Sequence, residues 1–187
     1  MQDLPYQDRP YQDRPYNVLV LCTGNSARSV LGEALFNVLG AGRFVAYSAG
    51  SRPSGRVQPM AAELCAQLGY DTSQLRSKSW DEFEAPGAPA MDIVITVCDN
   101  AAGETCPLWL GSPVTAHWGI DDPAAVEGDE DTRRHAYLKA FSALRRRVEL
   151  LLALPVEKLD RLVMEQKLRA IGNIDAVPAS DCAGETP

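Results

Sequence analysis

The sequence predicts an α/β fold, a three-layer domain in which a four-stranded parallel sheet is flanked by helices. Two observations carry this prediction. Short apolar runs rich in β-branched residues alternate along the chain with longer segments whose apolar residues recur at helical spacing. Strands that alternate with helices in this way form a parallel sheet covered on both faces. The length of 187 residues suits one such domain with tails and allows a sizeable core.

The first half of the chain supplies two strands and two helices. Val18–Leu21 is an unbroken apolar run, which is typical of a strand buried on both faces. Arg28–Leu39 places its apolar residues on one helical face, and Phe44–Ser48 follows it as the second strand. Met60–Leu68 repeats the helical spacing, and Gly69 ends that helix.

The second half repeats the alternation. Ile93–Val97 consists of β-branched residues and is expected to be a third buried strand, with Val114–Trp118 as the fourth. Thr132–Leu154 has the apolar spacing of a long helix. After Pro155, Val156–Ile171 is a further amphipathic segment, and it either packs on the domain or mediates dimerisation.

These elements divide the chain into a domain and its appendages. Residues 17–155 form the domain, and 156–171 form an additional C-terminal helix. Residues 1–16 repeat the sequence Pro-Tyr-Gln-Asp-Arg and are expected to be a flexible extension, because prolines at this spacing oppose helix and central strand. Residues 172–187 are expected to be a flexible tail, in which Cys182 is incidental.

The composition excludes several classes of protein. The hydrophobic content of 45% and charged content of 23% are ordinary for a globular protein, and a formal net charge of −7 argues against nucleic-acid binding. No apolar run approaches membrane-spanning length, and the N-terminus lacks a signal-peptide core. Five cysteines do not resemble a secreted disulfide framework. We expect a cytoplasmic protein without membrane or nucleic-acid partners, monomeric or weakly dimeric.

The segment between the first strand and the first helix has the composition of an oxyanion-binding loop. It is Cys22-Thr23-Gly24-Asn25-Ser26-Ala27-Arg28-Ser29. Backbone N–H groups of such a loop and of a helix N-terminus bind tetrahedral anions, and the same dipole favours the thiolate of Cys22 as a nucleophile. The planar fork of Arg28 suits two anion oxygens. Gly24 allows close backbone approach, Asn25 tolerates a left-handed conformation, and Ser29 can donate to the sulfur. The alternative is a structural cysteine beside a surface arginine.

Two further groups of residues suit chemistry at this loop. Asp121 and Asp122 precede Pro123, and either could protonate a leaving oxygen, although a pair of helix-start aspartates is an alternative. Cys98 follows a buried strand and should therefore lie at the same carboxyl edge as Cys22, with Cys106 beyond a small polar loop. A dithiol can supply two electrons by becoming a disulfide. The alternative is that Cys98 is a core cysteine and that Cys106 lies in the loop by chance. A zinc site is not indicated, because the spacing lacks a second pair of ligands.

Several segments together resemble the low-molecular-weight protein tyrosine phosphatase superfamily, and within it the arsenate reductases more than the phosphatases. The resemblance spans Asn17 to Leu154. Its carriers are the Cys22–Ser29 loop, Tyr47-Ser48-Ala49-Gly50-Ser51, the stretch Asp92 to Pro107, and His117-Trp118-Gly119-Ile120-Asp121-Asp122-Pro123-Ala124. It implies the fold of that family and the reduction of arsenate to arsenite, with phosphate as a competing anion.

The resemblance also implies roles for individual residues. Cys22 attacks arsenate in the loop of Thr23, Gly24, Asn25, Ser26, Ala27, Arg28 and Ser29, and the aspartate directly before proline, Asp122, is the acid. Cys98 then attacks Cys22 and releases arsenite. Cys106 passes the disulfide outward to Cys98–Cys106, where thioredoxin reduces it. No tightly bound cofactor is implied. Some relatives bind potassium beside the loop, and here Asn25, Glu33 and Asp81 would contribute.

The chain departs from the thioredoxin-coupled pattern in its cysteine spacing. Seven residues separate Cys98 from Cys106, one more than in those enzymes, and the loop position at which some relatives carry a second cysteine is Ala27. The reductant therefore stays open between thioredoxin, glutathione with glutaredoxin, and mycothiol. Cys65 is expected to belong to the core. A structural or orienting role is expected for His117, whereas His135 should lie on the exposed start of the long helix.

Two other functions remain open from the sequence. A phosphatase for phosphotyrosine or small phosphoesters would use the same loop, but Ala124-Ala125 after Pro123 offers no aromatic pair to clamp a phenyl ring. A non-catalytic oxyanion-binding or interaction module is the second alternative, with the N-terminal tyrosine repeat as a docking element. Cys22, Arg28 and Asp122 together argue against it.

Overall fold

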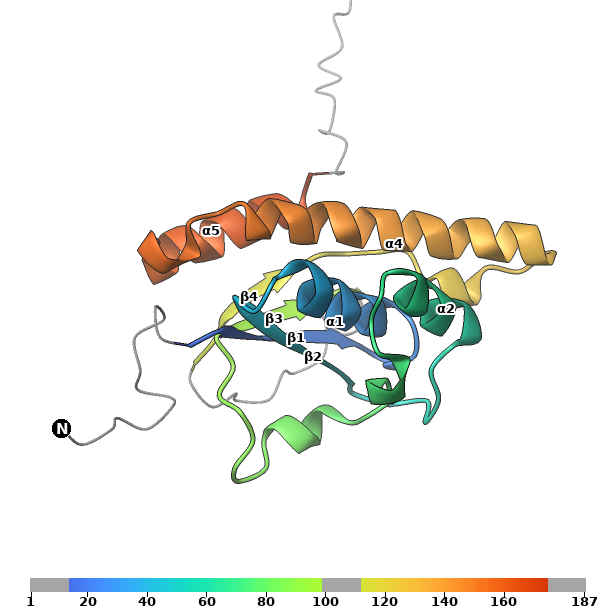
Figure 1. Cartoon of the computed structure of the whole chain (residues 1–187), viewed down its shortest axis with the longest axis horizontal. Helices are drawn as coiled ribbons and strands as arrows, with labels where there is room; N and C mark the ends of the chain where they lie inside the picture. The colour runs from blue at the N-terminus through green and yellow to red at the C-terminus, as the bar shows by residue number, and fades with distance from the viewer. Residues whose placement is uncertain (1–13, 99–111, 175–187) are drawn as a thin grey trace, which may run out of the picture.

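A four-stranded parallel sheet forms the centre of the molecule (Figure 1). The computed structural model describes residues 14–98 and 112–174. The strands are β1 (Tyr16–Cys22), β2 (Phe44–Gly50), β3 (Ile93–Thr96) and β4 (Val114–His117), in the spatial order β2-β1-β3-β4. All three pairings are parallel. The predicted four-stranded parallel sheet is confirmed, and β1 is longer than expected because its apolar run is extended at both ends by buried residues.

Four α-helices and several single 3-10 turns lie between or after the strands in the described part of the chain. The α-helices are α1 (Arg28–Leu39), α2 (Pro59–Gln67), α4 (Glu130–Leu152) and α5 (Arg161–Gly172). The 3-10 turns are η2 (Thr72–Gln74), η3 (Trp80–Phe83), η4 (Pro123–Ala125) and η5 (Val156–Lys158). None of these helices is long and apolar enough to cross a membrane.

The helix expected over Val156–Ile171 is interrupted near its start. Val156–Lys158 forms only the 3-10 turn η5, and the α-helix begins after Asp160. The Asp160 carboxylate accepts a hydrogen bond from the backbone N–H of Val163 at 2.9 Å, which makes it the N-cap of α5. The apolar spacing continues through this break, so periodicity alone did not reveal it.

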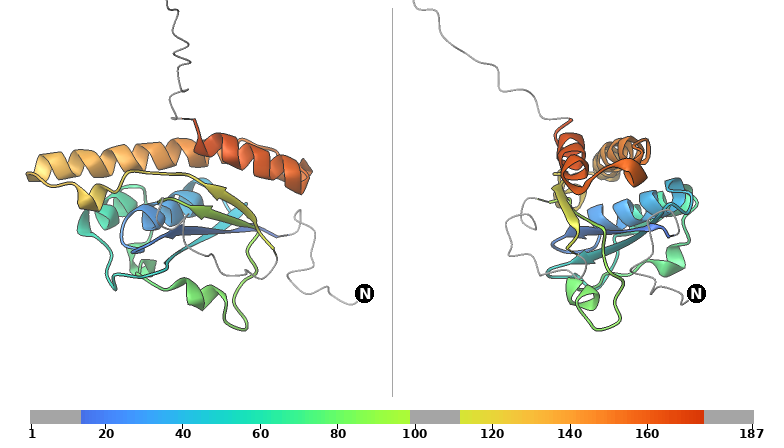
Figure 2. Two further views of the ribbon diagram at one scale, coloured as in Figure 1. Left: turned by 180° about the vertical axis from the view of Figure 1, so that it is seen from behind. Right: turned by 90° about the vertical axis from the view of Figure 1, so that its left-hand side faces the viewer.

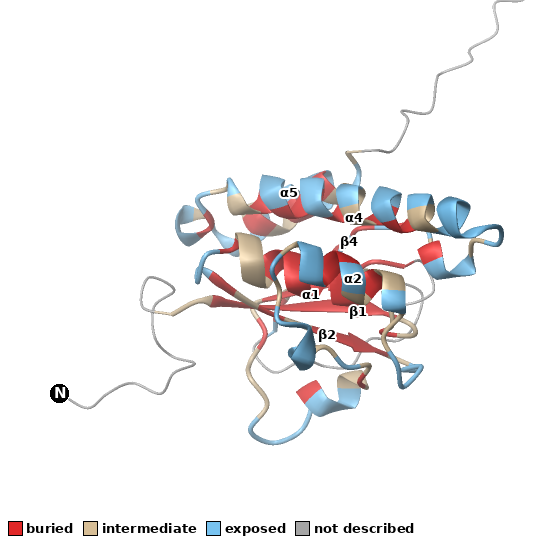
Figure 3. Ribbon diagram, turned by 45° about the vertical axis from the view of Figure 1, so that its right-hand side comes forward, coloured by how far each residue is buried: buried red, intermediate tan, exposed pale blue. Residues whose placement is uncertain are grey.

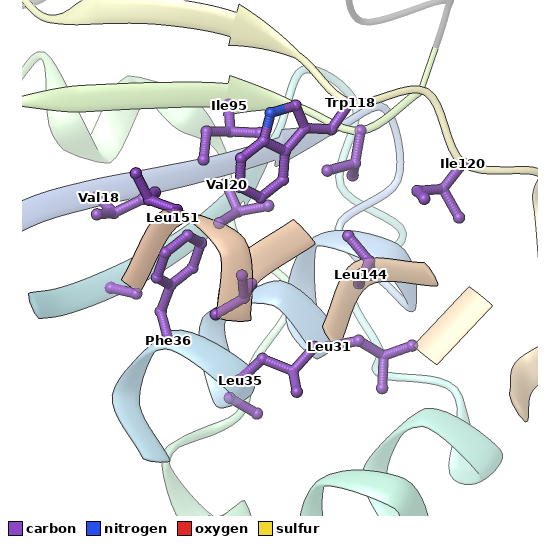
Figure 4. Close-up of a cluster of buried hydrophobic side chains, with 14 of the residues drawn as sticks. Val18, Val20, Leu31, Leu35, Phe36, Ile95, Trp118, Ile120, Leu144 and Leu151 are labelled. Carbon is purple, nitrogen blue, oxygen red and sulfur yellow. The ribbon is translucent and has the colours of Figure 1, made fainter. Parts of the chain in front are cut away.

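The main core lies between one face of the sheet and helices α1 and α4. Figure 4 shows Val18 and Val20 of β1 facing Phe36 of α1 and Leu151 of α4, with Trp118 closing the cluster from the end of β4. All five side chains are buried. Figure 3 shows the same division, with α1 buried while the outer sides of α4 and α5 are exposed. This face of the sheet carries most of the apolar burial, which is the main favourable contribution to folding.

The opposite face of the sheet has a thinner cover. Leu19 and Leu21 of β1 pack against Phe83 of η3 and against Met91 in a smaller second cluster. The segment between these two residues includes Ala85-Pro86-Gly87-Ala88-Pro89, whose prolines and glycine prevent a regular helix. Within the described residues, the second flanking layer is therefore a 3-10 turn and an irregular strap.

Helix α5 covers the β4 edge of the sheet. It lies beside α4 in both views of Figure 2 and packs on β4. The indole N–H of Trp118 donates to the carbonyl of Leu168 at 3.0 Å. A Cβ at Gly172 would lie 2.2 Å from the carbonyl oxygen of His117, so only glycine allows the helix end to approach this closely. The additional helix thus packs on its own domain.

The fold begins before the expected domain boundary at residue 17, because β1 starts at Tyr16 and Arg14 is also bound to the domain. Arg14 forms a two-pronged ion pair with Asp92, with N···O distances of 2.6 and 2.8 Å. Tyr16 is buried as the first residue of β1, and its ring stacks on Phe44 with centroids 5.5 Å apart. The end of the segment expected to be flexible is therefore part of the sheet. Residues 1–13 and 175–187, with most of the tyrosine repeat and Cys182, lie outside the described residues.

Candidate active site at the carboxyl end of the sheet

The strand order places a crevice at the end of β1. From β1 the chain crosses to β2 on one side of the sheet and later returns to β3 on the other. The carboxyl end of the strand at which the order reverses is the usual ligand site of open parallel sheets. Cys22 is the last residue of β1, and the loop that follows it leads into α1. The most informative segment of the sequence therefore lies where such a fold binds ligands.

Neighbouring backbone holds the carbonyl groups of this loop away from Cys22. The carbonyl oxygens of Thr23, Gly24 and Ser26 accept hydrogen bonds of 2.9–3.0 Å from backbone N–H groups in the segment 52–58. The negative ends of these peptide dipoles consequently point outward. The backbone N–H of Asn25 points inward and donates to Cys22 Sγ at 3.2 Å. This polarity suits a bound anion or a thiolate.

Asn25 ties the loop together from its centre. It has a positive φ of 42° and is fully buried, a conformation that asparagine tolerates better than most residues. Its side-chain N–H₂ donates to Ser29 Oγ and Ser48 Oγ, both at 2.9 Å, and its side-chain oxygen accepts from the backbone N–H of Lys78 at 2.7 Å. Three separate elements are therefore joined through one amide.

The sulfur of Cys22 is buried among donors. Ser29 Oγ lies 2.9 Å from Cys22 Sγ, and Cys22 is 4% exposed. Helix α1 starts at Arg28, and its N-cap residue Ala27 makes no side-chain capping bond. The first N–H groups of an uncapped helix attract negative charge. A thiolate at Cys22 and a tetrahedral anion above it would both be stabilised here.

The end of β2 packs directly on the loop. A Cβ at Gly50 would lie 2.4 Å from the carbonyl oxygen of Thr23 and 3.0 Å from the backbone nitrogen of Asn25. Real Cβ atoms do not approach backbone this closely, so any other residue would push the loop out of place. A Cβ at Gly24, by contrast, would meet nothing nearer than 3.7 Å.

Arg28 joins the nucleophile loop to the loop that carries Asp122. Its Nη2 lies 2.7 Å from a carboxylate oxygen of Asp122, and its Nη1 donates to the carbonyl of Ile120 at 2.9 Å. The side chain of Ile120 is buried in the core and anchors this second loop (Figure 4). The Asp122 carboxylate also accepts from the backbone N–H of Ala124 at 3.1 Å and so caps η4. Two segments 94 residues apart in sequence thus meet at one guanidinium.

The neighbouring aspartate lies away from this contact. Asp121 pairs with Lys139 of α4 at 3.1 Å, and both side chains are largely exposed. Of the two carboxylates considered from the sequence, Asp122 is therefore the one that the structure brings to Arg28.

Cys98 is the second sulfur beside the loop. It follows β3 directly, is buried, and its Sγ lies 3.5 Å from Thr23 Oγ1. Cys22, Cys65 and Cys98 all carry free thiols. Cys106 lies outside the described residues. Burial, and secondarily the charge of Glu33, raise the pKa of the Cys65 thiol on α2 to about 12, which suits a core residue and not a nucleophile.

The two histidines lie outside the contacts around Cys22. His117 ends β4, and its Nδ1 lies 2.9 Å from Thr96 Oγ1, consistent with an orienting role. His135 is on the exposed side of α4.

The residues expected to hold potassium do not form a cation site. Lys78 Nζ lies 3.3 Å from a carboxylate oxygen of Glu33, so an ammonium group already occupies the neighbourhood of that carboxylate. Asp81 is exposed and accepts from the Ser79 hydroxyl at the start of η3. No group of three or more potential His, Cys, Asp or Glu metal ligands occurs among residues 14–98 and 112–174. The residues present therefore do not fit a bound potassium ion.

Sequence analysis missed two residues of the site. Ser48 donates to Glu33 at 2.5 Å and accepts from Asn25, and Lys78 contacts both Glu33 and Asn25. Ser48 lies within a segment that carried the family resemblance, which was a usable signal. Lys78 gave no local signal, because a lysine in a polar connecting segment is ordinarily solvent-exposed.

Comparison with known proteins places most of the chain in one family. The model of the low molecular weight phosphotyrosine protein phosphatase family matches residues 17–165. An arsenate reductase of Halalkalibacterium halodurans is 31% identical over 132 residues, which cover 71% of this chain and 91% of that protein. An arsenate reductase of Bacillus subtilis is 34% identical over 116 residues, covering 62% of this chain and 80% of that protein.

Solved structures agree with the sequence relatives. An arsenate reductase in its phosphate-binding state superimposes with a TM-score of 0.57 at 27% identity, covering 74% of this chain and 97% of that one. The arsenate reductase of Archaeoglobus fulgidus has a TM-score of 0.54 at 30% identity, covering 71% and 98% of the two chains.

Proposed function

The chain belongs to the low molecular weight phosphotyrosine protein phosphatase family, and from this membership and the arrangement around Cys22 we propose that it is an arsenate reductase. Arsenate has the shape and charge of phosphate and suits the same loop. The nucleophile is Cys22, Arg28 binds the anion, Asp122 is the acid, and Cys98 is the first resolving thiol. The curated relatives named above support the choice of substrate.

One observation favours a reductase over a phosphatase. The thiol of Cys98 is buried against Thr23, in the same loop as the nucleophile, at the end of the strand next to β1. Phosphate-ester hydrolysis uses one sulfur and a water molecule. Reduction of arsenic from the +5 to the +3 state needs two electrons, which a second thiol close to the first can supply.

The first step is attack of the Cys22 thiolate on arsenic. Arsenate entering the loop competes with Asp122 for the Arg28 guanidinium, because both are oxyanions and Arg28 binds Asp122 at 2.7 Å. Arg28 then pairs with the anion, and the carboxyl group of Asp122 is released to act as the acid. Asp122 then gives its proton to the departing hydroxide, which leaves as water. An S–As bond joins Cys22 to arsenic(V).

The second step transfers the electrons. The deprotonated Cys98 attacks Cys22 Sγ, an S–S bond forms, and the S–As bond breaks. The electron pair of that bond stays on arsenic, which leaves as arsenite. Cys22 and Cys98 together are oxidised by two electrons, so the step balances. Thr23, whose hydroxyl contacts Cys98, holds the incoming thiol beside the loop.

Regeneration requires an external thiol. We propose that Cys106 attacks Cys98, which frees Cys22 and moves the disulfide to Cys98–Cys106, and that thioredoxin reduces it by exchange. Glutathione with glutaredoxin, or mycothiol, would instead attack the arsenic adduct or the first disulfide directly.

Arsenate-dependent oxidation of NADPH tests the proposal. Purified protein is assayed with thioredoxin and thioredoxin reductase, and separately with glutathione, glutaredoxin and glutathione reductase. Steady turnover in either system is expected, lost in Cys22→Ser and retained in Cys65→Ala as the matched control. If turnover with thioredoxin is lost in Cys106→Ser, the transfer of the disulfide to Cys98–Cys106 is supported. Turnover only with glutathione would contradict that transfer.

A phosphatase assay runs in parallel with p-nitrophenyl phosphate. Cys98→Ser is expected to retain any ester hydrolysis while ending arsenate turnover, since only reduction uses the second thiol. Phosphatase activity without arsenate turnover in both coupled systems would contradict the proposal and favour a phosphatase.

A further inference from the structure

A buried ion pair lies behind the nucleophile loop. Lys78 and Glu33 are each 7% exposed at their side chains, with Nζ and Oε2 3.3 Å apart. The other oxygen of Glu33 accepts from the Tyr70 hydroxyl at 3.0 Å. Withdrawing two charges from water carries a desolvation penalty that their attraction often fails to offset. Stability alone is therefore a weak reason for this pair, and its connections indicate a stronger one.

The charge of Glu33 determines the direction of the next hydrogen bonds. An ionised carboxylate only accepts, so Ser48 must donate its hydroxyl proton to Glu33 at 2.5 Å. The oxygen of Ser48 is then available to accept from the side-chain N–H₂ of Asn25 at 2.9 Å. The ammonium of Lys78 lies 3.3 Å from this carboxylate and balances its charge.

The orientation of the Asn25 amide determines which hydrogen bonds reach the sulfur of Cys22. Its side-chain oxygen accepts from the backbone N–H of Lys78, so its nitrogen faces Ser48 and Ser29. Ser29 Oγ accepts one of these N–H groups, and its own hydroxyl proton is left to point at Cys22 Sγ, 2.9 Å away. A donor directed at the sulfur stabilises the thiolate. The backbone N–H of Lys78 therefore sets the donor–acceptor sense from Asn25 to Cys22, and the Lys78–Glu33 pair holds Ser48 in place as the other acceptor of the amide.

We propose that Lys78 is a positioning residue that serves as a built-in cation for the nucleophile loop. Its backbone N–H orients the Asn25 amide, and its ammonium, paired with Glu33, holds Glu33 against Ser48, the second acceptor of that amide. The Ser29 hydroxyl proton is then left for Cys22. Because the cation belongs to the chain, the reactivity of Cys22 does not depend on potassium. The inference rests on the proposed function only in taking Cys22 as the nucleophile.

The test is the rate at which iodoacetamide alkylates Cys22. The peptide that carries Cys22 is quantified by mass spectrometry, with potassium chloride or choline chloride at equal ionic strength and neutral pH. The wild type should react equally in both salts. Lys78→Met should react about tenfold more slowly in choline, as expected for loss of a hydrogen bond to a charged group. Potassium, entering beside Glu33, should restore part of the rate.

Two variants serve as controls for charge and position. Lys78→Arg keeps the positive charge and should react at nearly the wild-type rate in both salts. Arg145→Met removes an exposed ion pair with Glu149 on α4, with no described bond to the loop or to Glu33, and should change nothing. A purely structural role for Lys78 would give no restoration by potassium.

A double variant covers the case in which Lys78→Met does not fold. Lys78→Met with Glu33→Gln removes both buried charges, so neither is left unpaired. It should react slowly and equally in both salts.

Wild-type reactivity in this variant or in Lys78→Met without potassium would overturn the inference, as would a potassium-dependent wild type. Alkylation requires no arsenate, so failure of the NADPH assay alone would count against the proposed function and leave this inference standing.

Discussion

Arg28 is placed so that one side chain can hold the Asp122 loop or bind an anion. Its two terminal nitrogens contact Ile120 and Asp122. The same fork would bind the oxygens of an entering anion. In the proposed mechanism this exchange of partners would couple anion binding to the release of Asp122, so one residue would link recognition to acid catalysis.

The two glycines beside Cys22 should respond differently to substitution. Gly50→Ala is expected to lower the melting temperature and weaken phosphate binding, because the new Cβ would lie 2.4 Å from the Thr23 carbonyl. Gly24→Ala should melt close to the wild type, since its Cβ meets nothing nearer than 3.7 Å. Thermal unfolding of both variants, with and without phosphate, makes the comparison. Equal melting temperatures would contradict the packing of β2 on the loop.

The thiol of Cys65 should not be alkylated in the native protein. Burial and the nearby Glu33 raise the pKa of its thiol to about 12, so at pH 8 it stays protonated, and only well above that pH would a thiolate appear. Alkylation followed by peptide mass spectrometry should leave Cys65 unmodified at pH 8 and label it fully after denaturation. Native labelling of Cys65 ahead of Cys22 would contradict this environment.

At the scale of elements, several helices and strands place residues at the end of β1. Helix α1 starts there without a side-chain cap, β2 supplies Gly50 and Ser48, and β3 delivers Cys98. The ends of three parallel strands meet at one edge of the sheet. Residues far apart in sequence therefore reach the same sulfur.

Helix α5 depends on the cap that separates it from η5. Asp160→Ala should destabilise the protein by about 1 kcal/mol, the usual cost of losing an N-cap side chain. Asp160→Asn is the matched control, because an amide oxygen can still accept from the Val163 N–H. Denaturant unfolding measures both. If the alanine variant were as stable as the asparagine variant, the cap would not be what starts this helix.

At the scale of the whole molecule, the two faces of the sheet are protected unequally. One face is covered by α1 and α4, and α5 closes the β4 edge (Figure 2). The other has, among the described residues, only η3 and the strap around Met91. Edge strands with unpaired backbone invite association. The packing of α5 on β4 removes that hazard on one side.

Burial along α5 should decide its contribution to global stability. Leu168→Ala is expected to cost about 2–5 kcal/mol, because Leu168 is fully buried beneath Trp118. Leu162→Ala, on the same helix but 71% exposed, should stay within about 0.5 kcal/mol of the wild type. Chemical denaturation checks both. Similar losses for the two variants would mean that α5 is not held by this packing.

The sequence by itself determined the four parallel strands, the extent of α1 and the nucleophile loop. These depend on local periodicity and on the residue types of short segments such as Cys22–Ser29, which can be recognised in the sequence without their tertiary partners. The bounds of α5 were less predictable, because the cap at Asp160 interrupts a spacing that continues on both sides of it. The pairing of Arg28 with one of two adjacent aspartates likewise had no local signature.

Only the tertiary structure decided which distant groups meet. Arg28 and Asp122 are 94 residues apart, and Lys78 and Glu33 are 45 apart. Whether a lysine is solvated or buried against a carboxylate depends on which elements pack around it, and no period or motif in the chain encodes that. Local patterns specify elements because they reflect neighbours along the chain. The contact of Lys78 with Glu33 and that of Arg28 with Asp122 are specified by neighbours in space.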